Sequence, residues 1–421
     1  MNLLDFCKDL YSVPRSITGN GVVETLKYIK KIIPIEIKQV KSGTRAFDWT
    51  VPPEWNIRDG YVIELSTGKK VIDFKSHNLH VVGYSEPVED EMSFEELEKN
   101  LFFLKDQPDA IPYITSYYQR RWGFCLSFNE FQRLDRNSRF KVFIDSEFKE
   151  DGDLTYGELI IQGEVEKEIF FSSYVCHPQM VNNELSGPSV LTGIADSLLK
   201  KPNYYTYRFV LIPETIGSIV YLSKNLDSLK KNVIGGYNIS CVGDERSWGL
   251  ITSRYGNNIS DKIGEYILKK HHPDFIKYSW LTRGSDERQY CSPGVDLPIS
   301  SVTRTKFGQY PEYHTSLDNF DVVTEKGLKD SLTIYLKIID VFEKNRFNPK
   351  VKVFCEPQLG KRGLYPNIST KQSGKIVQNM MNFISYCDGS NSILEISEIC
   401  GIDFDESFGY FLKMKENGLV E

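Results

Sequence analysis

From about Phe140 to Leu336, the sequence alternates between short apolar runs typical of strands and longer amphipathic runs typical of helices. This alternation predicts an α/β fold, with an at least partly parallel sheet covered by helices on both faces. The expected strands are Phe140–Ser146, Gly157–Gln162, Glu168–Val175, Arg208–Ile212, Val233–Cys241 and Val295–Val302, and the expected helices include Ser189–Lys200, Ile216–Asn225, Ile259–Lys270 and Thr324–Lys344.

Changes in composition divide the rest of the chain. Residues 3–12 and 21–33 have helical patterns and Ile35–Val40 a strand pattern, so we assign residues 1–47 to the α/β domain together with 136–348. Residues 48–135 are rich in aromatics and turn residues, which predicts an inserted β-rich domain. Residues 349–421 carry helix patterns at Lys375–Tyr386, Ile393–Cys400 and Phe404–Asn417, the spacing of a small winged-helix-like domain.

Composition excludes several classes of protein. The 51 basic and 57 acidic residues give a net charge of -6, which disfavours nucleic-acid binding. The segment from Asp388 to the last residue contains eight acidic residues and only two lysines, which disfavours DNA binding by the C-terminal domain. No signal peptide and no run of about 18 apolar residues is present, so we expect no membrane span. The eight cysteines are scattered without a CxxC pair. We therefore expect a cytoplasmic protein, and a homo-oligomer stays open.

The segment Cys176–Gly187 is the strongest functional signal. It follows the apolar run Ile169–Val175 and begins with Cys176-His177, and an Asn/Glu cluster lies six residues further on. Ligands of α/β sheets gather at the carboxyl ends of strands. Glu214, Asp244, Asp286 and His314 also stand near expected strand ends. Two imidazoles and several carboxylates at one sheet edge are what a catalytic zinc site requires.

In order and spacing these groups resemble the co-catalytic zinc aminopeptidases of the bacterial leucyl aminopeptidase and glutamate carboxypeptidase type. More closely, the chain resembles a bacterial branch of aminopeptidase-like proteins that carry an early inserted β domain and a C-terminal winged-helix-like domain, and that often accompany surface-polysaccharide genes. The motifs are Arg15-Ser16-Ile17-Thr18-Gly19, Asp48-Trp49-Thr50-Val51-Pro52, Trp122-Gly123-Phe124-Cys125, Asn183-Glu184-Leu185-Ser186-Gly187, Pro213-Glu214-Thr215-Ile216-Gly217-Ser218, Gly243-Asp244, Ser285-Asp286 and Tyr313-His314-Thr315-Ser316-Leu317-Asp318.

The resemblance implies an aminopeptidase-like mixed sheet flanked by helices, and it assigns roles. His177 and Asp244 would bind one zinc, His314 would be the ligand of a second metal position, and Glu214 would be the general base. Two positions depart from the pattern, because Asn183 stands where the bridging aspartate is expected and Thr215 where a glutamate ligand is expected.

Both departures remove negative charge, and two zinc ions need bridging anions. We therefore expect one zinc ion, held by His177, Asp244 and His314, with Asn183 or Glu184 as a weak fourth contact. Asp286 is a candidate for binding a substrate amine and Arg288 for binding a carboxylate or sugar acid. Tyr313 is a further candidate for contact with the substrate.

Two functions follow. The first is a zinc-dependent hydrolase of an amide bond in a small peptide or an aminoacylated or acylated sugar. The second is a catalytically impaired scaffold that binds a ligand or protein partner through the cleft in which an aminopeptidase would hold its substrate. Structural interpretations stay open beside them: Glu214 as a helix cap, Asp244 as a turn residue, and the tryptophans as packing residues rather than a sugar platform, namely Trp49, Trp55 and Trp122.

Overall fold

The computed structural model of the protein describes residues 1–364 and 371–421. The chain forms two compact units, Met1–Leu336 and Lys337–Glu421. In the described residues, no helix is both long and apolar enough to cross a membrane.

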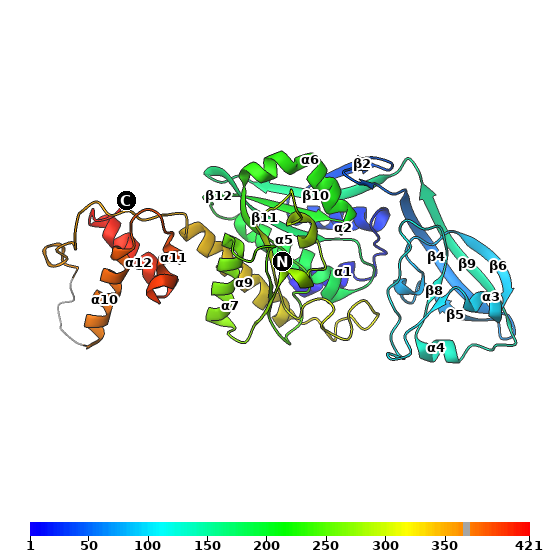
Figure 1. The fold of residues 1–421 in the computed structure, drawn as a ribbon. Helices are drawn as coiled ribbons and strands as arrows, with labels where there is room; N and C mark the ends of the chain where they lie inside the picture. The colour runs from blue at the N-terminus through cyan, green and yellow to red at the C-terminus, as the bar shows by residue number, and fades with distance from the viewer. Residues whose placement is uncertain (365–370) are drawn as a thin grey trace. The chain divides into compact units, whose positions relative to one another are not determined.

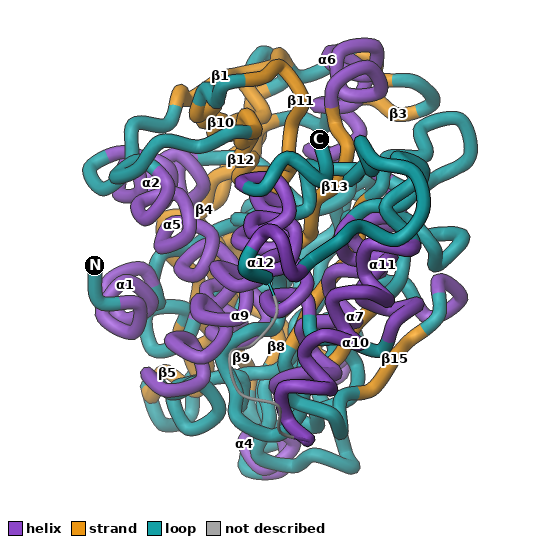
Figure 2. Tube along the Cα trace, turned by 90° about the vertical axis from the view of Figure 1, so that its left-hand side faces the viewer, coloured by secondary structure: helices purple, strands orange, loops and turns teal. Residues whose placement is uncertain are grey.

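The first unit is built on an eight-stranded sheet (Figures 1 and 2). Its centre is parallel, because β11 pairs in parallel with β12 and β13, and β13 pairs in parallel with β16. Antiparallel pairs flank this centre on both sides. The prediction of a mixed sheet is confirmed. The strand order is β1 (Glu36–Lys41), β10 (Asp153–Ile161), β12 (Tyr205–Ile212), β11 (Val165–Tyr174), β13 (Val233–Asn238), β16 (Ile299–Thr303), β14 (Gly249–Ile251) and β15 (Ile276–Tyr278).

Helices cover both faces of this sheet. The chain runs from β11 through α5 to β12 on one side, and from β12 through α6 to β13 on the other. Right-handed crossovers in opposite directions place α5 and α6 on opposite faces, and Figure 1 shows them on either side of the strands. The helices of this unit are α1 (Leu3–Leu10), α2 (Asn20–Lys30), α5 (Ser186–Leu198), α6 (Ile216–Asn232), α7 (Ile259–His271), the short α8 (Glu287–Tyr290) and the start of α9 (Glu325–Lys344).

The inserted part has its own four-stranded sheet in the order β5-β4-β9-β6. Strand β9 (Arg139–Lys149) pairs along its length with β4 (Glu54–Glu64), so the boundary expected at residue 135 is too early. The alternation of β9 identifies a strand but not the sheet that it joins, which depends on its distant partner. The remaining elements are β2 (Arg45–Ala46), β3 (Trp49–Thr50), β5 (Lys69–Asp73), β6 (Val88–Ser93), α3 (Phe94–Glu98), β7 (Leu101–Phe102), β8 (Phe124–Cys125) and α4 (Phe128–Gln132).

The three tryptophans for which a packing role stayed open differ in how deeply they are buried. Trp55 is buried and donates its indole N–H to the carbonyl of Ser85 at 2.9 Å. Trp122 packs against the apolar core of the inserted sheet. Trp49, in contrast, is 40% exposed, so the interpretation as a packing residue does not hold for it.

The second unit contains the end of α9 and three further helices: α10 (Lys371–Ser385), α11 (Ile393–Cys400) and α12 (Phe404–Glu416). Helix α11 begins with a capping box between Ser392 and Glu395 and ends at Gly401, whose φ of 64° suits glycine. The apolar faces of these helices bury Phe383, Leu394 and Phe411. The three predicted helices are confirmed.

Candidate active site

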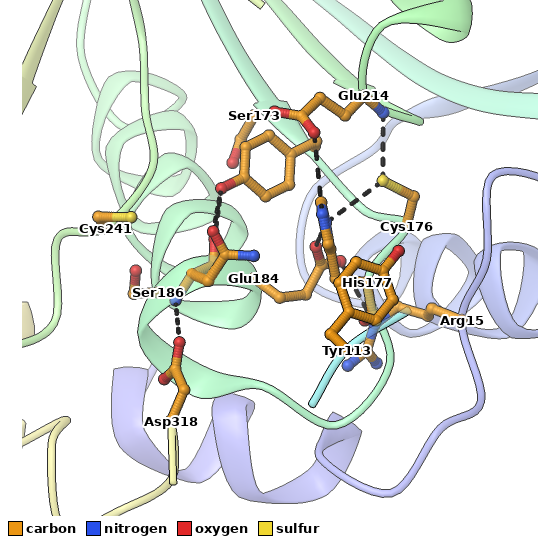
Figure 3. Close-up of polar contacts among 12 residues, drawn as sticks. Arg15, Tyr113, Ser173, Cys176, His177, Glu184, Ser186, Glu214, Cys241 and Asp318 are labelled. Carbon is orange, nitrogen blue, oxygen red and sulfur yellow. Dashed lines mark hydrogen bonds and ion pairs between the residues drawn. The ribbon is translucent and has the colours of Figure 1, made fainter. Parts of the chain in front are cut away.

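The central pair of residues follows two neighbouring parallel strands. Tyr174 at the end of β11 is paired with Ile212 at the end of β12, so the chain leaves both strands at the same sheet edge. His177 and Glu214 follow these ends directly. Their side chains lie together, with Nε2 of His177 3.8 Å from Oε2 of Glu214 (Figure 3).

The other ring nitrogen of His177 is bound by Glu184. Nδ1 lies 3.0 Å from Oε2 of Glu184, and Oε1 of the same carboxylate lies 3.3 Å from Nε of Arg15. All three side chains are buried, and Arg15 also donates to the carbonyl of His177 at 3.0 Å. This contact engages Nδ1 and leaves Nε2 as the ring nitrogen that faces Glu214.

A π-helical turn, Val181–Leu185, precedes α5 and sets the direction of Glu184. Such turns are rare and occur often at functional sites. The carboxylate of Asp318 accepts from the backbone N–H groups of Val181, Asn182 and Asn183 and so holds the turn in place. Sequence reasoning assigned no role to Asp318 or Arg15, although both stand in the motifs on which the resemblance rests.

A strained turn places Glu214. Thr215 has φ 64° and ψ -77°, and the N–H of Ile216 bonds to the carbonyl of Glu214 at 2.8 Å, which defines a classic γ-turn. Asp286 stabilises this turn, since its Oδ1 accepts from the N–H of Thr215 and the hydroxyl of Ser218, both at 2.8 Å. Strain of this kind persists where surrounding contacts over-determine it.

The expectation that Asp286 binds a substrate amine does not fit its placement, because the residue is 0% exposed and holds the turn. Burial and the neighbouring Glu214 raise its pKa to about 7. Burial likewise raises the pKa of Glu214. Asp286 is buried and Glu214 is half-buried, and two interacting carboxyl groups with raised pKa values are typical of acid–base sites.

The pKa values of the two histidines, His177 and His314, are shifted in opposite directions. Burial opposes the charge on His177, but the bond to Glu184 and the charges of Glu184 and Glu214 outweigh it, so its pKa is raised. Burial and the neighbouring His177 lower the pKa of His314 to about 3, which leaves a neutral imidazole, the form that binds metals. The two ring centroids are 5.4 Å apart. Tyr313 stacks on His314 with centroids 3.9 Å apart, so this candidate lies at the site.

Tyr113 of the inserted part covers both imidazoles. Its ring centroid lies 5.2 Å from that of His177 and 5.1 Å from that of His314. Its backbone N–H bonds to the carbonyl of His314 at 2.9 Å. Sequence reasoning missed Tyr113, because nothing local indicates which loop of an inserted domain reaches the sheet edge.

Asp244 does not join His177. Its carboxylate accepts from the N–H and hydroxyl of Thr305, from the side-chain amide of Asn182 and from the N–H of Arg246, at 2.7 to 3.2 Å. A carboxylate has about four acceptor positions, and all are occupied. Asp244 therefore joins the loop after β13 to the loop after β16, as a structural turn residue would.

Asn183 is buried, and its Oδ1 accepts from the hydroxyl of Tyr174 at 3.0 Å while Nδ2 has no partner in the described part of the chain. A neutral amide held in this way does not supply the negative charge that a two-metal centre needs. The geometry thus favours at most one metal ion.

A zinc ion in a protein needs three or four nitrogen, oxygen or sulfur donors that converge on one point. Within the described residues, the one group of three His, Cys, Asp or Glu side chains whose ligand atoms lie within 4.8 Å of one another is Cys176, His177 and Glu184. This group is a poor metal site, because the carboxylate oxygens of Glu184 already contact Arg15 and Nδ1 of His177. Burial also raises the pKa of the Cys176 thiol well above its usual range, which disfavours the thiolate that binds metals. On the opposite side of His177, Nε2 and the neutral ring of His314 offer two nitrogen donors for one zinc ion, and the carboxylate of Glu214 lies 3.8 Å from that Nε2. In the described residues these three side chains do not form a second group of that kind.

The comparisons agree with this architecture. Residues 4–345 match the family described as "Domain of unknown function (DUF4910)", and residues 348–421 match a winged helix-turn-helix family. A curated protein of Clostridium acetobutylicum, provisionally named a polysaccharide biosynthesis protein with an aminopeptidase-like domain, is 45% identical over 403 residues, or 96% of this chain and 92% of that protein.

Solved structures from two bacteria show how far the likeness extends. A crystal structure from Clostridium acetobutylicum, provisionally described as a peptidase, has a TM-score of 0.92 at 42% identity and covers 100% of this chain and 95% of that one. BSAP, a zinc aminopeptidase from Bacillus subtilis, has a TM-score of 0.56 at 11% identity, with 81% and 94% covered, which is a likeness of fold. The chain therefore belongs to the family described as Domain of unknown function (DUF4910), with an aminopeptidase-like fold and a C-terminal winged helix-turn-helix domain.

Proposed function

We propose that the protein is a metal-dependent hydrolase of an amide bond, with Glu214 as general base. The observation that carries the proposal is the orientation of His177, since Glu184 holds Nδ1 and leaves Nε2 3.8 Å from the carboxylate of Glu214. A histidine held by a carboxylate on one nitrogen is the usual arrangement of a metal ligand. The name of the Clostridium acetobutylicum relative favours an acylated or aminoacylated sugar as substrate.

His177 and His314 are the residues that would hold the ion, and the metal identity we propose is zinc. When bound, zinc supplies Lewis acidity toward a carbonyl oxygen and toward water. Glu214 would take a proton from the attacking water and pass it to the leaving nitrogen. Its raised pKa suits both steps, because a general base works best when its pKa is near the working pH.

A second candidate is a binding scaffold without hydrolytic activity. It is favoured by Asp244, whose four hydrogen bonds leave no free position for a metal, and by the neutral side chain of Asn183. The two candidates differ in whether the protein retains a metal.

Elemental mass spectrometry of the purified full-length protein tests the choice, with His177→Ala beside it. About one zinc ion per chain, lost in the variant, would support the hydrolase and justify a screen of aminoacyl and acyl-sugar amides. No zinc, even after its addition, would contradict the hydrolase and leave the scaffold.

A further inference from the structure

A cavity of about 310 Å³ lies beside Glu214. Glu214, Thr215 and Arg288 are among the residues that line it. Pockets for small ligands measure roughly 300 to 1,000 Å³, so this one is large enough for a single ring or residue. The mechanism above assigns it no occupant.

The inserted part contributes aromatic side chains to the lining, and two of them are open to solvent. Trp49 is 40% exposed and Tyr118 is 55% exposed, and their rings meet edge to face with centroids 6.0 Å apart. Tyr117 also lines the cavity. The faces of such rings carry negative charge density and attract the C–H bonds of a saturated ring laid against them. Exposed aromatics beside a cavity therefore favour a flat, C–H-rich ligand.

The lining also carries a cation, Arg288, whose charge acts to lower the pKa of the Glu214 and Asp286 carboxyls and which forms no ion pair within the described residues. Arg288 donates through Nη2 to the hydroxyl of Thr215, while its Nε is buried and has no partner within the described residues. A buried donor that stays unpaired is costly. The planar guanidinium matches a carboxylate through two parallel hydrogen bonds. Arg288 is thus suited to an anionic group of a ligand in the cavity.

We propose that this cavity binds a sugar acid, with its pyranose-sized ring against Trp49 and Tyr118 and its carboxylate on Arg288. A neutral sugar would offer no negative charge to Arg288, and an acidic amino acid would leave the rings of Trp49 and Tyr118 uncovered. The occupied cavity places the ligand next to Glu214. The proposal rests on the proposed function for the step that follows binding, but not for binding itself.

Ligand-observed NMR titration of the metal-free, full-length protein tests it, with D-glucuronate, D-glucose and N-acetyl-L-glutamate as probes. We expect glucuronate to bind at least 10-fold more tightly than either of the others. Arg288→Gln should reduce glucuronate to the affinity of glucose, and Arg288→Lys should retain part of the preference, because the charge stays but the planar fork is lost. Trp49→Ala should weaken glucuronate and glucose alike.

Arg283→Gln is the matched control, since Arg283 is exposed, lies over the ring of Trp280 and does not line the cavity. It should leave all three affinities unchanged. Equal affinity for glucuronate and glucose, or no binding of either, would overturn the proposal. Tighter binding of N-acetyl-L-glutamate that depends on Arg288 and not on Trp49 would also overturn it, in favour of a peptide ligand. Because neither metal nor turnover is needed, a failure of hydrolysis leaves this result readable.

Discussion

The carboxylate of Glu184 bridges Nδ1 of His177 at 3.0 Å and Nε of Arg15 at 3.3 Å, with both Arg15 and Glu184 side chains fully buried. This contact changes the role expected for Glu184, which is a partner of the histidine rather than a contact of the metal. It also explains why Arg15, more than 150 residues away in the sequence, belongs to the site.

Breaking the ion pair between Glu184 and Arg15 should lower the stability of the folded protein. Glu184→Gln leaves the Arg15 charge buried without its counter-ion, and we expect a loss of about 3–5 kcal/mol in the free energy of unfolding. Urea denaturation measures it. Asp196→Asn, which removes the exposed pair with Lys200, is the control and should cost at most about 0.5 kcal/mol. Equal losses in the two variants would contradict the assigned importance of burial.

Glu214→Gln tests the general base. Removing a base that transfers protons typically costs about 10²–10⁴-fold in rate, so we expect kcat to fall by that factor. Zinc content and unfolding free energy should match the wild type, because the amide keeps the size of the side chain. A variant that loses its zinc instead would assign Glu214 to metal binding.

The Asp244→Asn variant tests whether Asp244 is a metal ligand or a structural residue. The amide replaces an acceptor by a donor opposite the N–H and hydroxyl of Thr305, so we expect a loss of about 2–3 kcal/mol in stability. Zinc content should not change. Loss of zinc with unchanged stability would restore Asp244 as a ligand.

The raised pKa of Asp286 predicts a dependence of stability on pH. In the unfolded chain this carboxyl ionises near pH 4, whereas in the folded protein it stays protonated until about pH 7. Its contribution to stability is therefore fully present below about pH 4 and is lost as pH rises toward 7. Asp286→Asn does not titrate, so the stability of the variant relative to the wild type should rise over that interval. Unfolding free energies at pH 4, 5.5 and 7.5 check the slope, and a flat difference would contradict it.

Much of the fold can be predicted from local sequence patterns. Helix α11 has the predicted bounds, Ile393–Cys400, because its capping box and terminal glycine act within a few residues. His177 and Glu214 could be placed at one edge because successive parallel strands end on the same side of a sheet. These conclusions need only periodicity and chain direction.

The sequence by itself thus determined the alternation of strands and helices, the three C-terminal helices and the placement of His177 and Glu214 at one sheet edge. Only the tertiary structure decided that β9 belongs to the inserted sheet, that Asp244 is fully hydrogen-bonded, and that Glu184 points at His177. The physical reason is that each depends on a partner distant in the sequence. A side chain's role follows from which groups occupy its lone pairs and protons, and packing between separate segments decides that.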